Sequence, residues 1–469
     1  MICLRFLPNP IFSTFSRSPK LISRPFSYIK KFTISQIDPI KRAKFISNTL
    51  STLKKSGNIP KTIALFKEHL NILDDIHYAI IFSVFERGVK SPADARKLRE
   101  GVNFKKILDN TMDKLNHSNP PFFRVRQLSA IAHALSKVQS DDRRIFDYIV
   151  ENRDVIARTG DPIALSIISW SFATIGFRSV ELFDAIAEQH ERFVEKGDEK
   201  SLINTAWAFA KNDHKSPALF KAISGEYSKL VPKNNEVFLG NLLWAFAKNG
   251  ERADKLFEAV AGEHERLVVR GGDELALSTI LWAFATSNNS AHEFFTAVAK
   301  SNIASSSFPR ANNPHLAMSN IVWAFPINGE CDDSVMRKVF VDFAGVGSKM
   351  LTETKTKTKT DTDWLSRVLG SFAIAGVYDG RGVEDFLAKV WERVCEDEKL
   401  IFDEFALIAL ARFYIFAKVE APELALRLGK PHEGLFEKMA GGLEELEREE
   451  PNNWQREISH ILDKEVSER

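Results

Sequence analysis

The chain has 469 residues, of which 44% are hydrophobic and 27% charged, the composition of an ordinary globular protein. Its formal net charge is +2, and its three cysteines (Cys3, Cys331 and Cys395) lie too far apart to form a disulfide framework or a C-x-x-C zinc site. No apolar run reaches the roughly 18 residues of a membrane-spanning helix. The best candidate, residues 405–419, is interrupted by Arg412 and is expected to be a buried helix.

The N-terminus has the composition of an organellar presequence. Its first 37 residues contain six Lys/Arg and no Asp/Glu, and they lack the continuous apolar core of a secretory signal. The sequence "RPFS" at 24–27 resembles the mitochondrial processing pattern Arg-x-Phe followed by Ser. We therefore expect residues 1–26 to be a presequence, residues 27–59 a basic N-terminal segment, and the address a mitochondrion, with a plastid as the alternative. A disordered basic tail is the other interpretation.

A phrase built around tryptophan recurs along the chain, as in "NTAWAFAKND" (204–213) and "NLLWAFAKNG" (241–250). Five such phrases align on Trp170, Trp207, Trp244, Trp282 and Trp323, and weaker copies place His133 and Gly370 in the same slot. The five tryptophans are 37, 37, 38 and 41 residues apart. A Leu or Met stands five residues before each of these seven anchors, and a Phe stands thirteen residues after five of them. Agreement at several fixed offsets indicates a repeat array.

Each repeat is expected to be a helical hairpin. The tryptophan phrase ends near Gly or Asn, and the stretch after it, such as 253–268, has apolar residues at helical spacing. Stacked hairpins form an α-solenoid, so the predicted fold class is all-α. We expect the array to span 60–430, with its best repeats at 164–328, loop insertions at 302–315 and 349–363, and an acidic helical segment at 431–469.

The first helix of each hairpin is predicted to present one polar arc, at offsets −3, +1 and +4 from the anchor. Offsets −5, −2 and +2 are apolar and cluster on one side, whereas the tryptophan faces the other way and is expected to be an inter-repeat knob. The candidate RNA-binding residues are those at −3 (Asn204, Asn241, Thr279, Asn320 and Arg367) and at +4 (Lys137, Lys211 and Lys248). Asn can pair with a base edge and Lys can neutralise a phosphate. Capping or bridging between helices is the alternative role for Asn.

No enzyme signature is present, and no cofactor or metal is expected. The sequence lacks a glycine-rich phosphate loop, G-x-S-x-G and H-E-x-x-H. His190 and His264 occupy equivalent places in "AEQHERFV" and "AGEHERLV", which predicts a partly exposed helix position for both.

Charge is unevenly distributed along the chain. Residues 1–126 hold 23 Lys/Arg against 9 Asp/Glu, and residues 433–469 hold 5 Lys/Arg against 11 Asp/Glu.

The tryptophan phrase and its period resemble the repeats of octotricopeptide proteins, of the helical arrays that precede RAP domains, and of RNA-editing substrate-binding complex subunits. The resemblance implies a non-catalytic α-solenoid that binds single-stranded organellar RNA in RNA maturation, stability, editing or translation. Its implied partners are other organellar RNA-processing or ribosomal proteins, without membrane insertion. Residues 451–469 are similar to the helix that introduces a RAP domain, but the domain itself is absent from the sequence. The alternative is a protein–protein scaffold or assembly factor, because the near-neutral chain lacks a strongly basic composition.

Overall fold

The computed structural model describes residues 39–117, 123–269, 273–301, 314–328, 333–353, 359–396 and 404–428, together with 435, 438 and 439. All regular elements in these ranges are helices, which confirms the predicted all-α class. The presequence 1–26, nearly all of the segment 431–469 and the middle of both predicted insertions lie outside the described residues.

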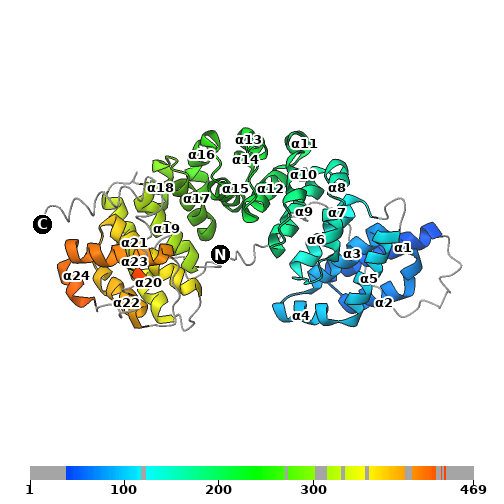
Figure 1. Cartoon of the computed structure of the whole chain (residues 1–469), viewed down its shortest axis with the longest axis horizontal. Helices are drawn as coiled ribbons and strands as arrows, with labels where there is room; N and C mark the ends of the chain where they lie inside the picture. Colours follow the sequence, from blue (N-terminus) through cyan, green and yellow to red (C-terminus); the bar gives the residue numbers. More distant parts are fainter. Residues whose placement is uncertain are drawn as a thin grey trace, which may run out of the picture.

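The helices form two layers that follow an arch (Figure 1). The inner layer is a row of helices in which each contacts the next along the chain. Its members are α1 (Pro39–Ser56), α3 (Asp75–Gly88), α6 (Val125–Lys137), α9 (Pro162–Ile175), α12 (Glu199–Lys211), α15 (Glu236–Asn249), α17 (Glu274–Thr286), α19 (Pro314–Asn328), α21 (Lys359–Ala375) and α23 (Glu404–Glu420). Each tryptophan anchor therefore lies on an inner helix, and these helices line the concave side of the arch.

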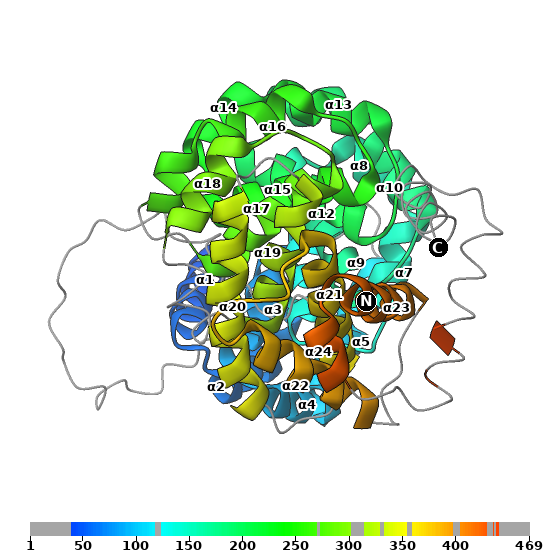
Figure 2. The ribbon, with the colours of Figure 1, turned by 90° about the vertical axis from the view of Figure 1, so that its left-hand side faces the viewer.

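The outer layer holds the second part of each repeat, and in several repeats it is broken into two short helices. The outer members are α2 (Ile59–His69), a 3-10 turn (Leu70–Ile72), α4 (Pro92–Glu100), α5 (Val102–His117), α7 (Arg144–Glu151), α8 (Arg153–Thr159), α10 (Val180–Ala187), α11 (His190–Lys196), α13 (Pro217–Gly225), α14 (Tyr227–Lys233), α16 (Asp254–Ala261), a π turn (Glu265–Val269), α18 (His292–Lys300), α20 (Asp333–Glu353), α22 (Val383–Glu396) and α24 (Pro422–Arg427). The view turned by 90° shows α13, α14 and α16 at the crest of the arch (Figure 2).

The break in the outer helices differs from the single second helix predicted for 253–268. Helix α16 ends at Ala261, and the chain re-enters a helical turn only at Glu265. At the break, Nδ1 of His264 lies 3.3 Å from the carbonyl oxygen of Ala261, and His190 makes the same contact with Ala187. The two equivalent histidines are half-buried, and each lies where the outer segment changes direction.

The core is built from phenylalanine pairs that join successive repeats. The Phe thirteen residues after one anchor meets the Phe two residues after the next anchor, mostly edge to face. The pairs are Phe146–Phe172, Phe183–Phe209, Phe220–Phe246, Phe257–Phe284 and Phe295–Phe325, with ring centroids 5.1, 4.8, 4.9, 5.4 and 5.1 Å apart. All ten rings are buried. Each outer helix is thus fixed to the inner helix of the following repeat.

Six of the inner helices (α6, α9, α12, α15, α17 and α21) end at a residue with left-handed backbone, six residues after the anchor. The residues at this position are Gln139 (φ 52°), Gly176 (68°), Asp213 (55°), Gly250 (68°), Asn288 (52°) and Gly376 (62°). Glycine, asparagine and aspartate tolerate this conformation best, which explains why the repeated phrase ends in Asn, Asp or Gly.

A second inter-repeat contact lies in the outer layer. Arg192 donates to the carbonyl oxygens of Ala157 and Arg158 in the preceding repeat. Arg266, two repeats further on, donates to Val231 and Asn234 at 3.0 and 2.9 Å, and Lys229 between them donates to Gly197 at 3.2 Å. The sequence offered a signal for these contacts, because 192, 229 and 266 are spaced by the repeat period.

The boundaries of the predicted insertions differ from the structure. Helix α20 continues to Glu353, α21 begins at Lys359, and α19 begins at Pro314. Residues 349–353, 359–363 and 314–315 are therefore helical rather than loop.

The phenylalanine pairs generate a prediction for stability. Phe246→Ala should lower the free energy of unfolding by about 3–5 kcal/mol, because it leaves a cavity beside Phe220 in a fully buried site. Trp244→Ala, two residues away on the half-exposed side of the same helix, should cost less. Denaturant unfolding of both variants measures the difference, and a larger loss for Trp244→Ala would contradict this account of the core.

Candidate nucleic-acid interface

Four positions of the inner helices α3 to α15 lie on the concave side. Neighbouring inner helices cover two sides of an inner helix and the outer layer covers a third, so the concave side is formed mainly by offsets −7, −3, 0 and +4. At about 100° per residue these offsets fall within an arc of about 60°. We call them the inner rows. They hold Ile76, Ile80, Ser83 and Arg87 on α3; Arg126, Ala130, His133 and Lys137 on α6; Ile163, Ile167, Trp170 and Thr174 on α9; Lys200, Asn204, Trp207 and Lys211 on α12; and Val237, Asn241, Trp244 and Lys248 on α15. In α3, Ser83 takes the anchor position because Phe85 lies two residues after it.

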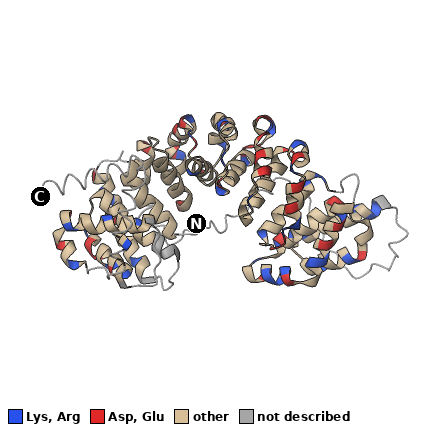
Figure 3. Ribbon diagram, viewed as in Figure 1, with Lys and Arg blue, Asp and Glu red and all other residues tan. Residues whose placement is uncertain are grey.

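The inner rows from α3 to α15 are basic. They carry six cations, Arg87, Arg126, Lys137, Lys200, Lys211 and Lys248, and no Asp or Glu. Charged residues as a whole are spread over both layers, as Figure 3 shows. The local excess therefore arises from helical register and not from the composition of the chain, whose net charge is only +2.

The structure corrects the predicted polar arc. Offset +1 is not accessible, because Ala208 and Ala245 are fully buried against neighbouring helices. The tryptophan, at offset 0, lies on the concave side in place of the residue at offset +1. Trp170 and Trp244 are half-buried there, and Trp207 is 9% exposed to solvent. The sequence pattern separated the tryptophan from the Leu and Phe side of the helix, and its helical angle of about 60° from offset −3 agrees with the position of the ring beside the −3 residues.

The anchor rings form a ladder along the concave side. Trp170 and Trp207 stack with centroids 6.3 Å apart, Trp207 and Trp244 lie 6.4 Å apart, and so do Trp282 and Trp323. His133 extends the ladder, 5.0 Å from Trp170. The tryptophan thus serves as the predicted inter-repeat knob, because its ring lies close to the ring of a neighbouring repeat.

The predicted −3 residues divide into two groups. Asn204 and Asn241 are half-buried on the inner rows, and their side-chain amides make no hydrogen bond to another described residue. The other three are engaged within the protein. The Thr279 hydroxyl donates to the Leu275 carbonyl at 2.7 Å, and Nη1 of Arg367 donates to Oδ1 of Asn320 at 3.2 Å. Asn320 is only 6% exposed, so the structure removes it from the accessible surface and gives it the bridging role.

Lys137 lies in a partly desolvated cluster at the N-terminal end of the ladder. Its ammonium is 4.7 Å from the centroid of the Trp170 ring, a cation–π contact. Burial lowers the pKa of Lys137, and the nearby Glu86 carboxylate partly offsets this effect. Glu86 also meets Nδ1 of His133 at 3.3 Å. Burial likewise lowers the pKa of Lys54 on the adjacent helix α1. These ammonium groups are poorly hydrated for cations, which favours contact with an anion.

Lys248 already has an internal partner. Its Nζ lies 2.8 Å from Oδ1 of Asp213, and Oδ2 of the same carboxylate accepts from Arg178 at 2.6 Å. The hydrogen bond from Lys248 is the main cause that lowers the pKa of Asp213. Arg178, Asp213 and Lys248 belong to three successive repeats, so this carboxylate joins them at the rim of the concave side. The sequence did not predict this bridging carboxylate, because its pattern indicates only that Asp213 ends a helix.

Neither a metal-binding cluster nor a membrane-spanning helix is found among the described residues. They contain no group of three or more His, Cys, Asp or Glu arranged to hold a metal ion. Within the same ranges, no helix is long and apolar enough to cross a membrane.

The fold and this surface define the class of protein: an α-solenoid whose concave side carries a basic row beside stacked aromatic rings. Residues 100–330 of the chain match the family model of the RNA-editing substrate-binding complex 6 protein. The matched stretch contains α5 to α19 and therefore all five tryptophan anchors. This finding supports the part of the sequence resemblance that concerns the RNA-editing complex, whereas the octotricopeptide and RAP-associated part stays a prediction. No curated protein matches the chain significantly.

Proposed function

We propose that this chain binds single-stranded organellar RNA along the inner rows of α3 to α15, as a non-catalytic component of an RNA-editing substrate-binding complex. The observation that carries the proposal is the charge of these rows, which hold six Lys/Arg and no Asp/Glu in a nearly neutral chain. The match of residues 100–330 to a family whose name refers to substrate binding in RNA editing supports it.

The inner rows supply the two kinds of contact that helical-repeat RNA binders use. Lys and Arg at −7 and +4 can neutralise phosphates, which sets affinity and its salt dependence. The free amides of Asn204 and Asn241 at −3 can pair with base edges, which sets sequence preference. We assign the tryptophan ladder a structural role in spacing the repeats, because the rings of successive repeats lie 6.3 and 6.4 Å apart.

A second candidate function, docking of a partner protein, is favoured by the next two inner helices. The same four positions hold no charged residue on α17 and α19, where they are Leu275, Thr279, Trp282, Thr286, Leu316, Asn320, Trp323 and Ile327. Such a surface has no cation for a phosphate, whereas half-buried tryptophan and leucine suit a protein interface. A scaffold role would extend the RNA surface of α3 to α15 rather than replace it.

The lysine pair gives the main test of RNA binding. Replacing Lys211 and Lys248 by Gln should weaken binding of all single-stranded RNA sequences and flatten the slope of log affinity against log salt by about 1.4, two contacts at about 0.7 each. Fluorescence anisotropy at several salt concentrations measures both. Lys221 and Lys255, exposed lysines of the outer layer in the same two repeats, provide the matched control pair. Equal effects of the two pairs, or no RNA binding by the wild-type chain at low salt, would defeat the proposal.

Asp213 gives a test in the opposite direction. Asp213→Asn should raise RNA affinity several-fold at low salt, because it removes the carboxylate that competes with phosphate for Lys248 and Arg178. Its effect on stability should stay below about 1 kcal/mol, because the three side chains are well exposed. Asp254→Asn is the control, since Asp254 pairs with Arg252 in the outer layer. An unchanged affinity for Asp213→Asn would show that RNA does not contact this part of the rim.

The proposed address is the mitochondrion, on the composition of residues 1–37 and the pattern "RPFS". A fusion of residues 1–45 to a fluorescent protein should enter mitochondria and yield a mature N-terminus near Ser27. The same fusion with Arg5, Arg17 and Arg24 replaced by Gln is the control and should remain outside. Plastid import would correct the organelle, and diffuse cytosolic signal would refute the presequence.

A further inference from the structure

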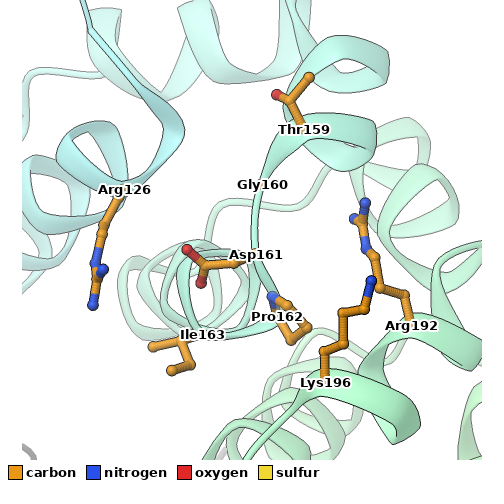
Figure 4. Close-up of a pocket in the computed structure, with 8 residues that line it drawn as sticks. All are labelled: Arg126, Thr159, Gly160, Asp161, Pro162, Ile163, Arg192 and Lys196. Carbon is orange, nitrogen blue, oxygen red and sulfur yellow. The ribbon is translucent and has the colours of Figure 1, made fainter.

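A hollow of about 350 Å³ opens at the rim of the concave side, between the start of α6, the turn from α8 to α9, and α11. Its lining residues are Arg126, Thr159, Gly160, Asp161, Pro162, Ile163, Arg192 and Lys196. Figure 4 shows Arg126 on one side of Asp161, with Arg192 and Lys196 on the other. The volume is at the small end of the range for sites that hold small molecules.

The hollow has an excess of positive charge that the described residues do not neutralise. Three cations face one carboxylate, and Asp161 already accepts the hydrogen bond of the Ala164 amide as the N-cap of α9. Arg192 donates to the backbone carbonyls at the end of α8, and its buried Nε has no hydrogen-bond partner among the described residues. Arg126 and Lys196 form no ion pair with a described carboxylate, and both are exposed. An anion would complete this arrangement.

In the next repeat, the lysine at the equivalent position is neutralised by a carboxylate. Lys233 is the equivalent of Lys196, and its Nζ lies 2.8 Å from the carboxylate of Glu199. Pro162 stands in the place of Glu199, one period of 37 residues earlier. Both residues begin an inner helix, where proline and glutamate are equally acceptable. Lys196 is therefore without a carboxylate partner because one position carries Pro instead of Glu.

The remaining wall is apolar and continues the inner rows. Ile163 is 38% exposed and, with Pro162, forms a surface on which a ribose or a base can rest. Arg126 and Ile163 are also the −7 residues of α6 and α9, so the hollow begins where the basic concave surface ends. A strand that lies along that surface can turn over the rim at this point.

We propose that this hollow binds one nucleotide of the RNA strand, with its phosphate between Arg126 and Lys196 and its ribose or base against Ile163 and Pro162. The inference rests on the RNA binding proposed above and names a site that shares Arg126 and Ile163 with the inner rows and adds Arg192 and Lys196 of α11. A free nucleoside monophosphate has the same chemistry, and the experiment separates the two sources.

Pro162→Glu is the most informative variant, because it supplies the carboxylate found at this place in the next repeat and removes no cation. It should flatten the salt slope of single-stranded RNA binding by about 0.7, one phosphate contact. The double variant Arg126→Gln/Lys196→Gln should have the same effect. Lys233→Gln, the same substitution one repeat further on, is the matched control and should leave the slope unchanged. Circular dichroism checks that each variant is folded.

Cross-linking locates the nucleotide directly. The full chain is mixed with a single-stranded RNA that contains 4-thiouridine, irradiated, and digested for mass spectrometry. Cross-links within 159–163 or 192–196 that disappear in Pro162→Glu support the site. If RNA binding depends on Lys211 and Lys248 but is unchanged by Pro162→Glu, this inference is overturned and the proposed function is left intact. Absence of RNA binding by the wild-type chain overturns both, and uridine monophosphate that binds the hollow while RNA does not reach it assigns the site to free nucleotide.

Discussion

The contact between one buried phenylalanine and the next along the array is the constraint on which the rest of this structure depends. Because the Phe of an outer helix meets the Phe of the following inner helix, each of the joined repeats buries part of its core against its neighbour. The contact also fixes the rotation of each inner helix. Once the Leu and Phe side faces the outer layer, offsets −7, −3, 0 and +4 must face the concave side.

That rotation converts an ordinary composition into a charged surface. The chain has almost equal numbers of acidic and basic residues, yet every Lys, Arg, Asp or Glu position in the inner rows of α3 to α15 is occupied by Lys or Arg. Net charge therefore says little about what a solenoid binds, since the ligand meets one face of one layer. The field of that face governs association with a polyanion, and acids elsewhere reduce it only at a distance.

If the surface binds RNA as proposed, the acids that border it compete with phosphate for its cations. Asp213 holds Lys248 and Arg178, Glu199 holds Lys233, and Glu86 lies among Lys54, His133 and Lys137. Each pair keeps a long flexible cation in place while the surface is empty. Where such an acid is missing, as at Pro162, the unpaired cations mark a place that an external anion can fill.

The sequence by itself determined the fold class, the repeat period, the residues of the core and the position at which each inner helix ends. It could do so because these features depend on local spacing, which is the same in each copy. The position of Asn204, Asn241, Lys211 and Lys248 on one accessible face could also be predicted in this way, since one face of a helix can be calculated from its period.

Only the tertiary structure decided which of the candidate residues remain accessible. Asn320 is used by Arg367, Lys248 is held by Asp213, offset +1 is buried, and the tryptophans lie on the concave side. The hollow at Pro162 has no sequence signature, because its walls come from four helices of two repeats. Contacts between repeats depend on how far each helix is rotated and displaced against the next, and the spacing of residues within one helix carries no information about that.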